Sequence, residues 1–116
     1  MMERDEQKAA VTTTLYTDGA SRGNPGDAAW AYVIVQDGSV AASRSGFIGT
    51  ATNNVAEYHA VINGLEAARE FTRGGLIVRS DSELVVRQLT GRYRITREHL
   101  ADLAGEVRRL VRHFRE

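Results

Sequence analysis

With 116 residues, 42% of them hydrophobic, the chain is long enough for one compact domain with a moderate core and leaves little room for a second. Zero cysteines exclude a disulfide framework and a thiolate zinc site, and they suit a reducing cytoplasm, where we expect the protein to reside. The net charge is zero, but 8 of the 15 Lys and Arg residues fall after residue 86. Residues 1–11 are charged and lack an apolar segment, so we expect a disordered lead without a membrane anchor and a domain over 12–116.

The first half of the chain contains three runs rich in β-branched and aromatic residues, which predict strands. These runs are 12–17, 28–35 and 40–48. Asp18 ends the first run, ahead of a Gly-Asn-Pro-Gly turn sequence at 23–26. Asp37-Gly38, between the second and third runs, is a strong hairpin signal. We therefore expect an antiparallel meander of three strands.

The second half changes to helical spacing of its apolar residues, which predicts a helix over 54–71. The short apolar run 76–78 predicts a buried fourth strand parallel to the first, because a helical crossover precedes it. Asp81 stands at the end of that strand, and a short helix over 82–89 follows. The last predicted helix, 97–114, is amphipathic, with an apolar face and an arginine-rich face. The pattern indicates an α/β fold with a mixed sheet and flanking helices.

Three carboxylates, Asp18, Glu57 and Asp81, fall at predicted junctions between strands and helices. Taken singly, each has a structural explanation: Asp18 stabilises a turn, Glu57 closes a capping box begun by Asn54, or Asp81 caps the helix opened by Ser82. Taken together, they would converge at one edge of the sheet and repel one another. A divalent cation relieves that repulsion, and hard oxygen ligands in an open site favour Mg²⁺ over zinc.

The three acids lie in DGASRGNPG, TNNVAEY and SDSELVV, which in this order and spacing resemble the type 1 ribonuclease H family over about residues 12–115. No lysine-rich insertion follows Ser82, so the chain is more similar to the archaeal-like branch of that family. The resemblance implies hydrolysis of the RNA strand of RNA·DNA hybrids, leaving a 3′ hydroxyl and a 5′ phosphate. It also implies a catalytic pair of Mg²⁺ ions, with Mn²⁺ as a substitute. By motif, Asp18 bridges the ions, while Glu57 and Asp81 bind the one on the leaving-group side.

The resemblance also assigns a set of residues to the hybrid substrate. These are Gly19, Asn24, Thr52, Asn53, Asn54 and Glu83. Asn24 and Thr52 would contact a DNA phosphate, Asn53 and Asn54 bases or sugars, and Gly19 would let the RNA strand approach the backbone. Glu83 departs from the glutamine of many relatives, and an ionised carboxylate cannot donate a hydrogen bond.

Without the resemblance, residues 52–54 would be interpreted as the start of a helix. The arginines at 92, 94 and 97 are either phosphate contacts or an ordinary exposed face.

Members of this family continue into a fifth strand and a helix that carries a fourth metal-binding aspartate, whereas this sequence stops at Glu116. Two functions are therefore open: a nuclease, weakened or completed by Glu116 or a partner's acid, and a hybrid-binding module without turnover. We also expect the fourth strand to be a bare sheet edge, because the fifth strand is missing. Bare edges invite pairing, so a homodimer through this edge or the last helix is a further expectation.

Overall fold

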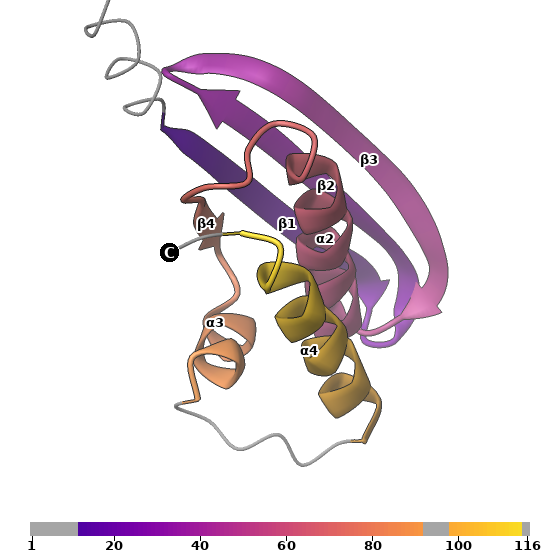
Figure 1. Ribbon diagram of the computed structural model, residues 1–116. Coiled ribbons are helices and arrows are strands. Elements are labelled where there is room, and N and C mark those ends of the chain that lie inside the picture. The colour runs from indigo at the N-terminus through magenta and orange to yellow at the C-terminus, as the bar shows by residue number, and fades with distance from the viewer. Residues whose placement is uncertain (1–11, 92–97, 115–116) are drawn as a thin grey trace, which may run out of the picture.

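The computed structural model describes residues 12–91 and 98–114. Its sheet has four strands in the order β3-β2-β1-β4 (Figure 1). The strands are β1 (Thr13–Gly23), β2 (Gly26–Gln36), β3 (Ser39–Ala51) and β4 (Ile77–Ser80). The helices are α2 (Asn53–Ala68), α3 (Glu83–Leu89) and α4 (Glu98–Val111). The first three strands are antiparallel neighbours and β4 runs parallel to β1, which confirms the predicted mixed sheet.

The turn between β2 and β3 forms where the sequence predicts it. Asp37 and Gly38 both have positive φ, 50° and 84°, and the residues on either side, Gln36 and Ser39, pair across the hairpin. Two consecutive positive φ values match the twist of a two-residue hairpin, and glycine adopts such values without strain.

The first strand is longer than predicted, and Asp18 lies within it rather than at its end. β1 and β2 stay paired from Thr13 opposite Gln36 to Gly23 opposite Gly26, so only Asn24 and Pro25 form the turn. Turn residues in the sequence mark where a chain can bend, but the ladder continues as far as both strands can pair.

Helix α2 begins one residue earlier than predicted, because Thr52 caps it. The Thr52 hydroxyl oxygen accepts a hydrogen bond from the Val55 N–H at 3.3 Å. The alternative explanation of Glu57 as part of a capping box begun by Asn54 is therefore wrong: Asn54 is inside the helix, and Glu57 lies beyond its first turn. Thr52 is the better cap because its short hydroxyl reaches the free N–H three residues later.

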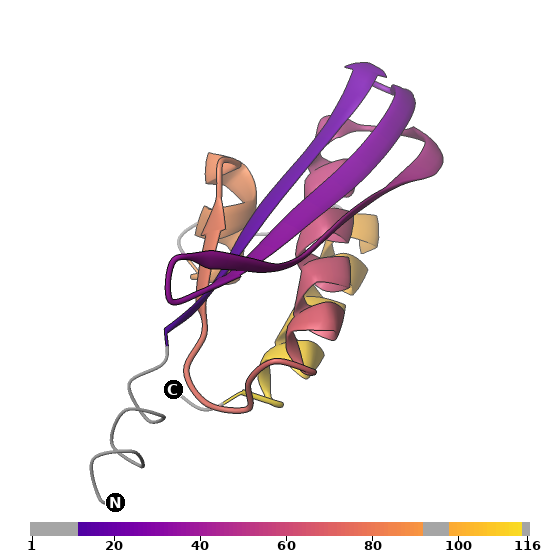
Figure 2. The ribbon, with the colours of Figure 1, turned by 90° about the horizontal axis from the view of Figure 1, so that it is seen from above.

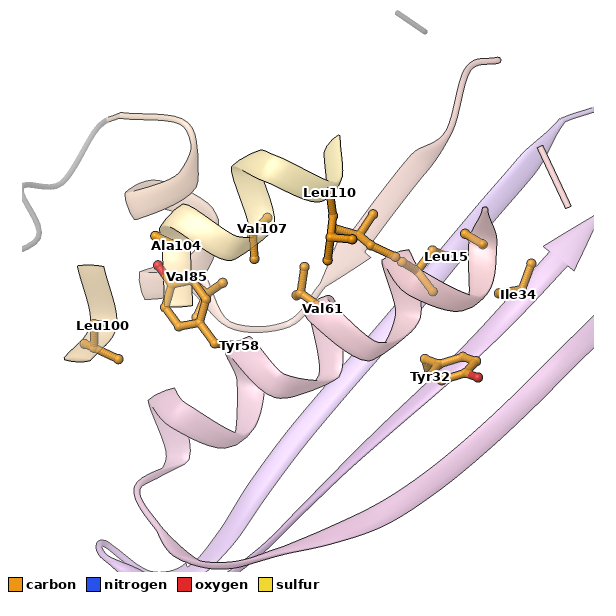
Figure 3. Close-up of a cluster of buried hydrophobic side chains, with 12 residues drawn as sticks. Leu15, Tyr32, Ile34, Tyr58, Val61, Val85, Leu100, Ala104, Val107 and Leu110 are labelled. Carbon is orange, nitrogen blue, oxygen red and sulfur yellow. The ribbon is translucent and has the colours of Figure 1, made fainter. Parts of the chain in front are cut away.

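One face of the sheet is covered by α2, which packs on β1 and β2, while α4 packs on α2 and α3 (Figure 2). Side chains of β1 alternate between buried and exposed, as expected for a strand with one covered face. The core joins all these elements through Leu15, Tyr32, Ile34, Tyr58, Val61, Leu65, Ala68, Val85, Leu100, Ala104, Val107 and Leu110 (Figure 3). Val111, predicted on the apolar face of the last helix, is instead 49% exposed, because Leu110 already faces α2 at the end of α4.

Strand β4 is a sheet edge in the described part of the chain, as predicted, since it pairs with β1 alone. The prediction that it is buried is wrong: Ile77 and Val78 are 45% and 42% exposed.

None of the helices within 12–91 and 98–114 is long and apolar enough to cross a membrane. The predicted disordered lead, residues 1–11, lies outside the described residues.

Candidate active site

Asp18 and Glu57 are brought together where β1 approaches α2. The backbone N–H of Gly19 donates a hydrogen bond to Glu57 Oε1 at 3.1 Å. Gly19 makes this approach possible, since a Cβ at its position would lie 2.3 Å from the backbone carbon of Ala56. Any larger residue would push α2 away from the strand that carries Asp18.

Glu57 is half-buried, and its surroundings disfavour its charge. Burial is the largest cause, followed by the negative charge of Asp18, and together with a smaller contribution from Asp81 they raise the pKa of Glu57 from 4.5 to about 7. The Gly19 N–H acts in the opposite direction, because it stabilises the carboxylate. A carboxyl group whose pKa is raised by burial together with two nearby acids is characteristic of a functional site.

Asp81 reaches this site through the parallel pairing of β4 with β1. Thr17 pairs with Ser80, the last residue of β4, so Asp18 and Asp81 each directly follow a member of the same pair. Asp81 does not cap α3, because the Ser82 hydroxyl accepts the Val85 N–H at 3.2 Å and performs that task. Asp18 and Asp81 line one hollow of about 570 Å³ on the molecular surface.

Asp18, Glu57 and Asp81 do not form a closed cage of ligands. Among residues 12–91 and 98–114, no three His, Cys, Asp or Glu side chains are close enough to hold a metal ion by themselves. Mg²⁺ suits such a site, because it keeps several waters and is usually bound by one or two carboxylates together with substrate phosphates. The mutual repulsion at Glu57 and the all-oxygen ligand set therefore fit a hard divalent cation.

A second polar cluster lies at the turn between β1 and β2, next to the start of α2. The Ser21 N–H donates to Asn53 Oδ1 at 2.8 Å, and the Asn53 N–H donates to Asn24 Oδ1 at 3.0 Å. Because backbone N–H groups can only donate, both amide oxygens are identified and both point inward. The NH₂ groups of Asn24 and Asn53 take no part in these bonds, and both residues are exposed.

The sequence itself matches known proteins along most of its length. A family model described as "Reverse transcriptase-like" matches residues 16–116. The crystal structure of RNase H1 from the halophilic archaeon Halobacterium salinarum superposes with a TM-score of 0.85 and 44% identity, covering 89% of this chain and 79% of that one. The chain belongs to the type 1 ribonuclease H family. The resemblance inferred from three motifs is thus confirmed.

Other proteins are also similar to this chain in sequence or in structure. LC11-RNase H1, solved in complex with an RNA/DNA hybrid, is 37% identical with a TM-score of 0.83, over 87% of this chain and 77% of that one. Ribonuclease HI of Halobacterium salinarum is 54% identical over 77 residues, which are 66% of this chain and 39% of the relative. A bifunctional protein of Mycobacterium tuberculosis is 40% identical over 107 residues, which are 90% of this chain and 29% of the relative. The chain thus spans between a quarter and two fifths of these two curated relatives.

The remaining residues expected at a ribonuclease H site differ in their surroundings. Thr52 uses its hydroxyl oxygen as the α2 cap and keeps its hydroxyl hydrogen available, and Asn54 is half-buried in the first turn of α2. Glu83 is exposed at the start of α3 and forms an ion pair with Arg87. The arginines at 92, 94 and 97, and Glu116, lie outside the described residues.

Sequence reasoning missed two contacts, one in the polar cluster at the turn and one in the core. Ser21 holds the Asn53 amide, and only its place inside the 18–26 motif indicated it. The bond between Tyr58 and Gln88 joins residues 30 positions apart, and no local pattern predicts such a pair.

Proposed function

We propose that this ribonuclease H family member is a metal-dependent endonuclease that hydrolyses the RNA strand of RNA·DNA hybrids, leaving a 3′ hydroxyl and a 5′ phosphate. The observation that carries the proposal is the placement of Glu57 beside Asp18, where the Gly19 N–H donates to Glu57 Oε1. Burial, Asp18 and Asp81 together raise the pKa of Glu57 there. Repelling carboxylates are unfavourable for the stability of the fold. In a nuclease site, bound cations neutralise these charges and take part in the chemistry.

Asp18, Glu57 and Asp81 would hold two Mg²⁺ ions, or Mn²⁺ as a substitute, and such ions supply water activation and stabilisation of the departing 3′ oxygen when bound. Glu57 Oε1 keeps its Gly19 hydrogen bond, which fixes the orientation of the carboxylate. Asp18 is exposed and so is accessible to a scissile phosphate. The protein's part is to hold three carboxylates where β1, the end of β4 and the start of α2 meet.

The hybrid would lie across the β1–β2 turn and the start of α2. The NH₂ groups of Asn24 and Asn53 can donate to phosphate, sugar or minor-groove acceptors, and Thr52 can donate its hydroxyl hydrogen. Asn54 and the backbone at Gly19 would add further contacts to the hybrid. Glu83 would contact RNA through a water, because its carboxylate only accepts.

The proposal extends to the compartment in which the protein acts and to its association with a second copy. We place the activity in the cytoplasm, which the cysteine-free sequence supports. We also propose that two copies associate along β4, or through α4. The exposure of Ile77 and Val78 on an edge strand supports the first arrangement.

The decisive experiment measures cleavage of a labelled RNA·DNA hybrid with Mg²⁺, with Mn²⁺ and with EDTA. Asp18→Asn should abolish metal-dependent cleavage, while Asp102→Asn, the same change at an exposed position of α4, should leave it intact. Unimpaired cleavage by Asp18→Asn would contradict the site assignment.

The open arrangement of the acids favours one alternative, a hybrid-binding module without turnover. In that case the chain would bind the hybrid without cutting it, and Asp18→Asn would bind with equal or higher affinity because a negative charge near phosphates is removed.

A further inference from the structure

Tyr58 and Gln88 form a hydrogen bond inside the hydrophobic core. The Tyr58 hydroxyl donates to Gln88 Oε1 at 2.7 Å and so joins α2 to α3. Tyr58 is fully buried and Gln88 is 5% exposed. Figure 3 shows the Tyr58 ring in the same cluster as Val85 of α3 and Ala104 of α4. The two helices are therefore linked by a polar contact within apolar surroundings.

This bond is more selective than the apolar contacts around it. Burial raises the pKa of the Tyr58 hydroxyl, with Arg108 acting in the opposite direction, so the group stays a donor at neutral pH. Apolar side chains such as Val85 tolerate small sliding movements, whereas a hydrogen bond requires both distance and angle. Losing the bond would leave a buried polar group without its partner, which is unfavourable. The pair therefore favours one placement of α3 against α2.

Tyr58 is adjacent in sequence to one carboxylate of the candidate site, and Gln88 lies in the last turn of the helix whose N-terminal cap follows another. Glu57 directly precedes Tyr58 in α2, and Asp81 directly precedes Ser82, the residue that caps α3. A movement of α3 relative to α2 would therefore change the separation between Asp81 and Glu57. The placement of the two helices and the placement of the two acids are coupled.

The strand that leads to Asp81 gives it limited support. β4 has four residues and pairs with β1 alone among the described strands. Its residues Ile77 and Val78 are half-exposed, so burial contributes little to its position. The docking of α3 is thus the second constraint on Asp81.

We propose that Tyr58 and Gln88 are positioning residues that hold Asp81 at the separation from Glu57 and Asp18 required to bind the catalytic ions. The inference rests on the proposed function. The position of Asp81 relative to Glu57 and Asp18 can nevertheless be followed without metal or substrate.

Three variants of the full chain test it. Tyr58→Phe removes the donor and leaves the Gln88 amide buried without it. Tyr58→Phe combined with Gln88→Leu removes both polar groups and keeps their volume, so packing is retained while the directional bond is lost. Tyr32→Phe is the matched control, because it removes a hydroxyl from the same cluster at a ring that stacks on Trp30 instead of contacting α3.

The expected results separate position from stability. Tyr58→Phe should lower the melting temperature by several degrees, and the double variant should recover it. Both should shift the Asp81 and Ser82 amide resonances in metal-free ¹H–¹⁵N spectra, while Tyr32→Phe leaves those resonances in place. Both should weaken Mn²⁺ binding, followed by electron paramagnetic resonance, by about tenfold, as when residues that orient metal ligands are lost. Cleavage should show a lower kcat with an unchanged KM.

A double variant that recovers the parent resonances and Mn²⁺ affinity together with stability would overturn the proposal, because packing alone would then place Asp81. If the parent chain neither binds Mn²⁺ nor cleaves hybrid, the proposed function fails, and the Asp81 and Ser82 resonances decide the positioning role alone. Resonances that stay unchanged in both Tyr58 variants would refute that role.

Discussion

The backbone N–H of Gly19 donates a hydrogen bond to the Glu57 carboxylate across 38 positions of sequence. Through this bond the residue after Asp18 holds the next acid of the site. The contact exists because Gly19 has no side chain to separate β1 from the backbone of α2 at Ala56. One glycine thus sets the spacing of two acids.

Gly19→Ala should destabilise the fold and the site together. The added methyl would lie 2.3 Å from the Ala56 carbonyl carbon, so α2 would have to move, at about 1–3 kcal/mol of unfolding free energy. Urea unfolding measures this loss. Gly105→Ala is the control, since open space surrounds that position in α4 and alanine should stabilise the helix by about 0.5–1 kcal/mol. Equal effects of the two changes would contradict the close approach.

Glu57→Gln should stabilise the metal-free protein in a pH-dependent way. Because folding raises the pKa of Glu57 from 4.5 to about 7, the folded state binds more protons than the unfolded state between these values. Stability therefore falls as pH rises through that window, and the unfavourable contribution is complete above pH 7. The variant removes it, giving a gain of about 1 kcal/mol at pH 8 after discounting for partial exposure, and none at pH 4.

Thermal unfolding in EDTA at both pH values measures the Glu57 effect. Glu66→Gln, which changes an exposed carboxylate of the same helix paired with Arg69, should show no comparable gain at pH 8. A gain from Glu57→Gln that is equal at pH 4 and pH 8 would disprove the titration of that group.

Asn53→Asp should keep the turn intact and weaken hybrid binding. An aspartate oxygen can still accept from the Ser21 N–H, but the NH₂ donor becomes a charged acceptor. We expect about tenfold weaker hybrid binding by the variant than by the parent. Raising the salt should narrow this difference only by the part that comes from charge repulsion. Fluorescence anisotropy at two salt concentrations measures both parts.

Asn63→Asp is the matched control for this charge. It lies on the same helix, and its amide donates to the His59 carbonyl at 2.8 Å instead of facing the turn. Equal losses of hybrid affinity in the two variants would show that charge on α2, and not the lost donor, is responsible.

Ile77→Lys should prevent association along β4. A lysine on an exposed edge strand opposes pairing with a second copy, and Ile77 is 45% exposed, so the fold should lose less than about 0.5 kcal/mol. Light scattering at micromolar concentration compares the parent with the variant. Val40→Lys, on the opposite edge strand β3, should leave association unchanged. A parent chain that is already monomeric rules out the dimer.

The sequence predicted the elements whose signals are local. The Asp37-Gly38 hairpin, the helix that Thr52 opens and the parallel fourth strand all follow from turn chemistry and periodicity, and three motifs identified the family. Boundaries were less predictable. Whether β1 stops at Asp18 depends on whether a partner strand continues beside it, and that partner begins after the turn.

Only the tertiary structure decided how the site is held. The pKa of Glu57 depends on burial and on two acids from other elements, and the inward orientation of the Asn53 amide depends on the backbone of a neighbouring strand. The Tyr58–Gln88 bond joins two helices separated by a strand. Residue type determines what a side chain can do, but distance and solvent access, which only the folded chain defines, determine what it does.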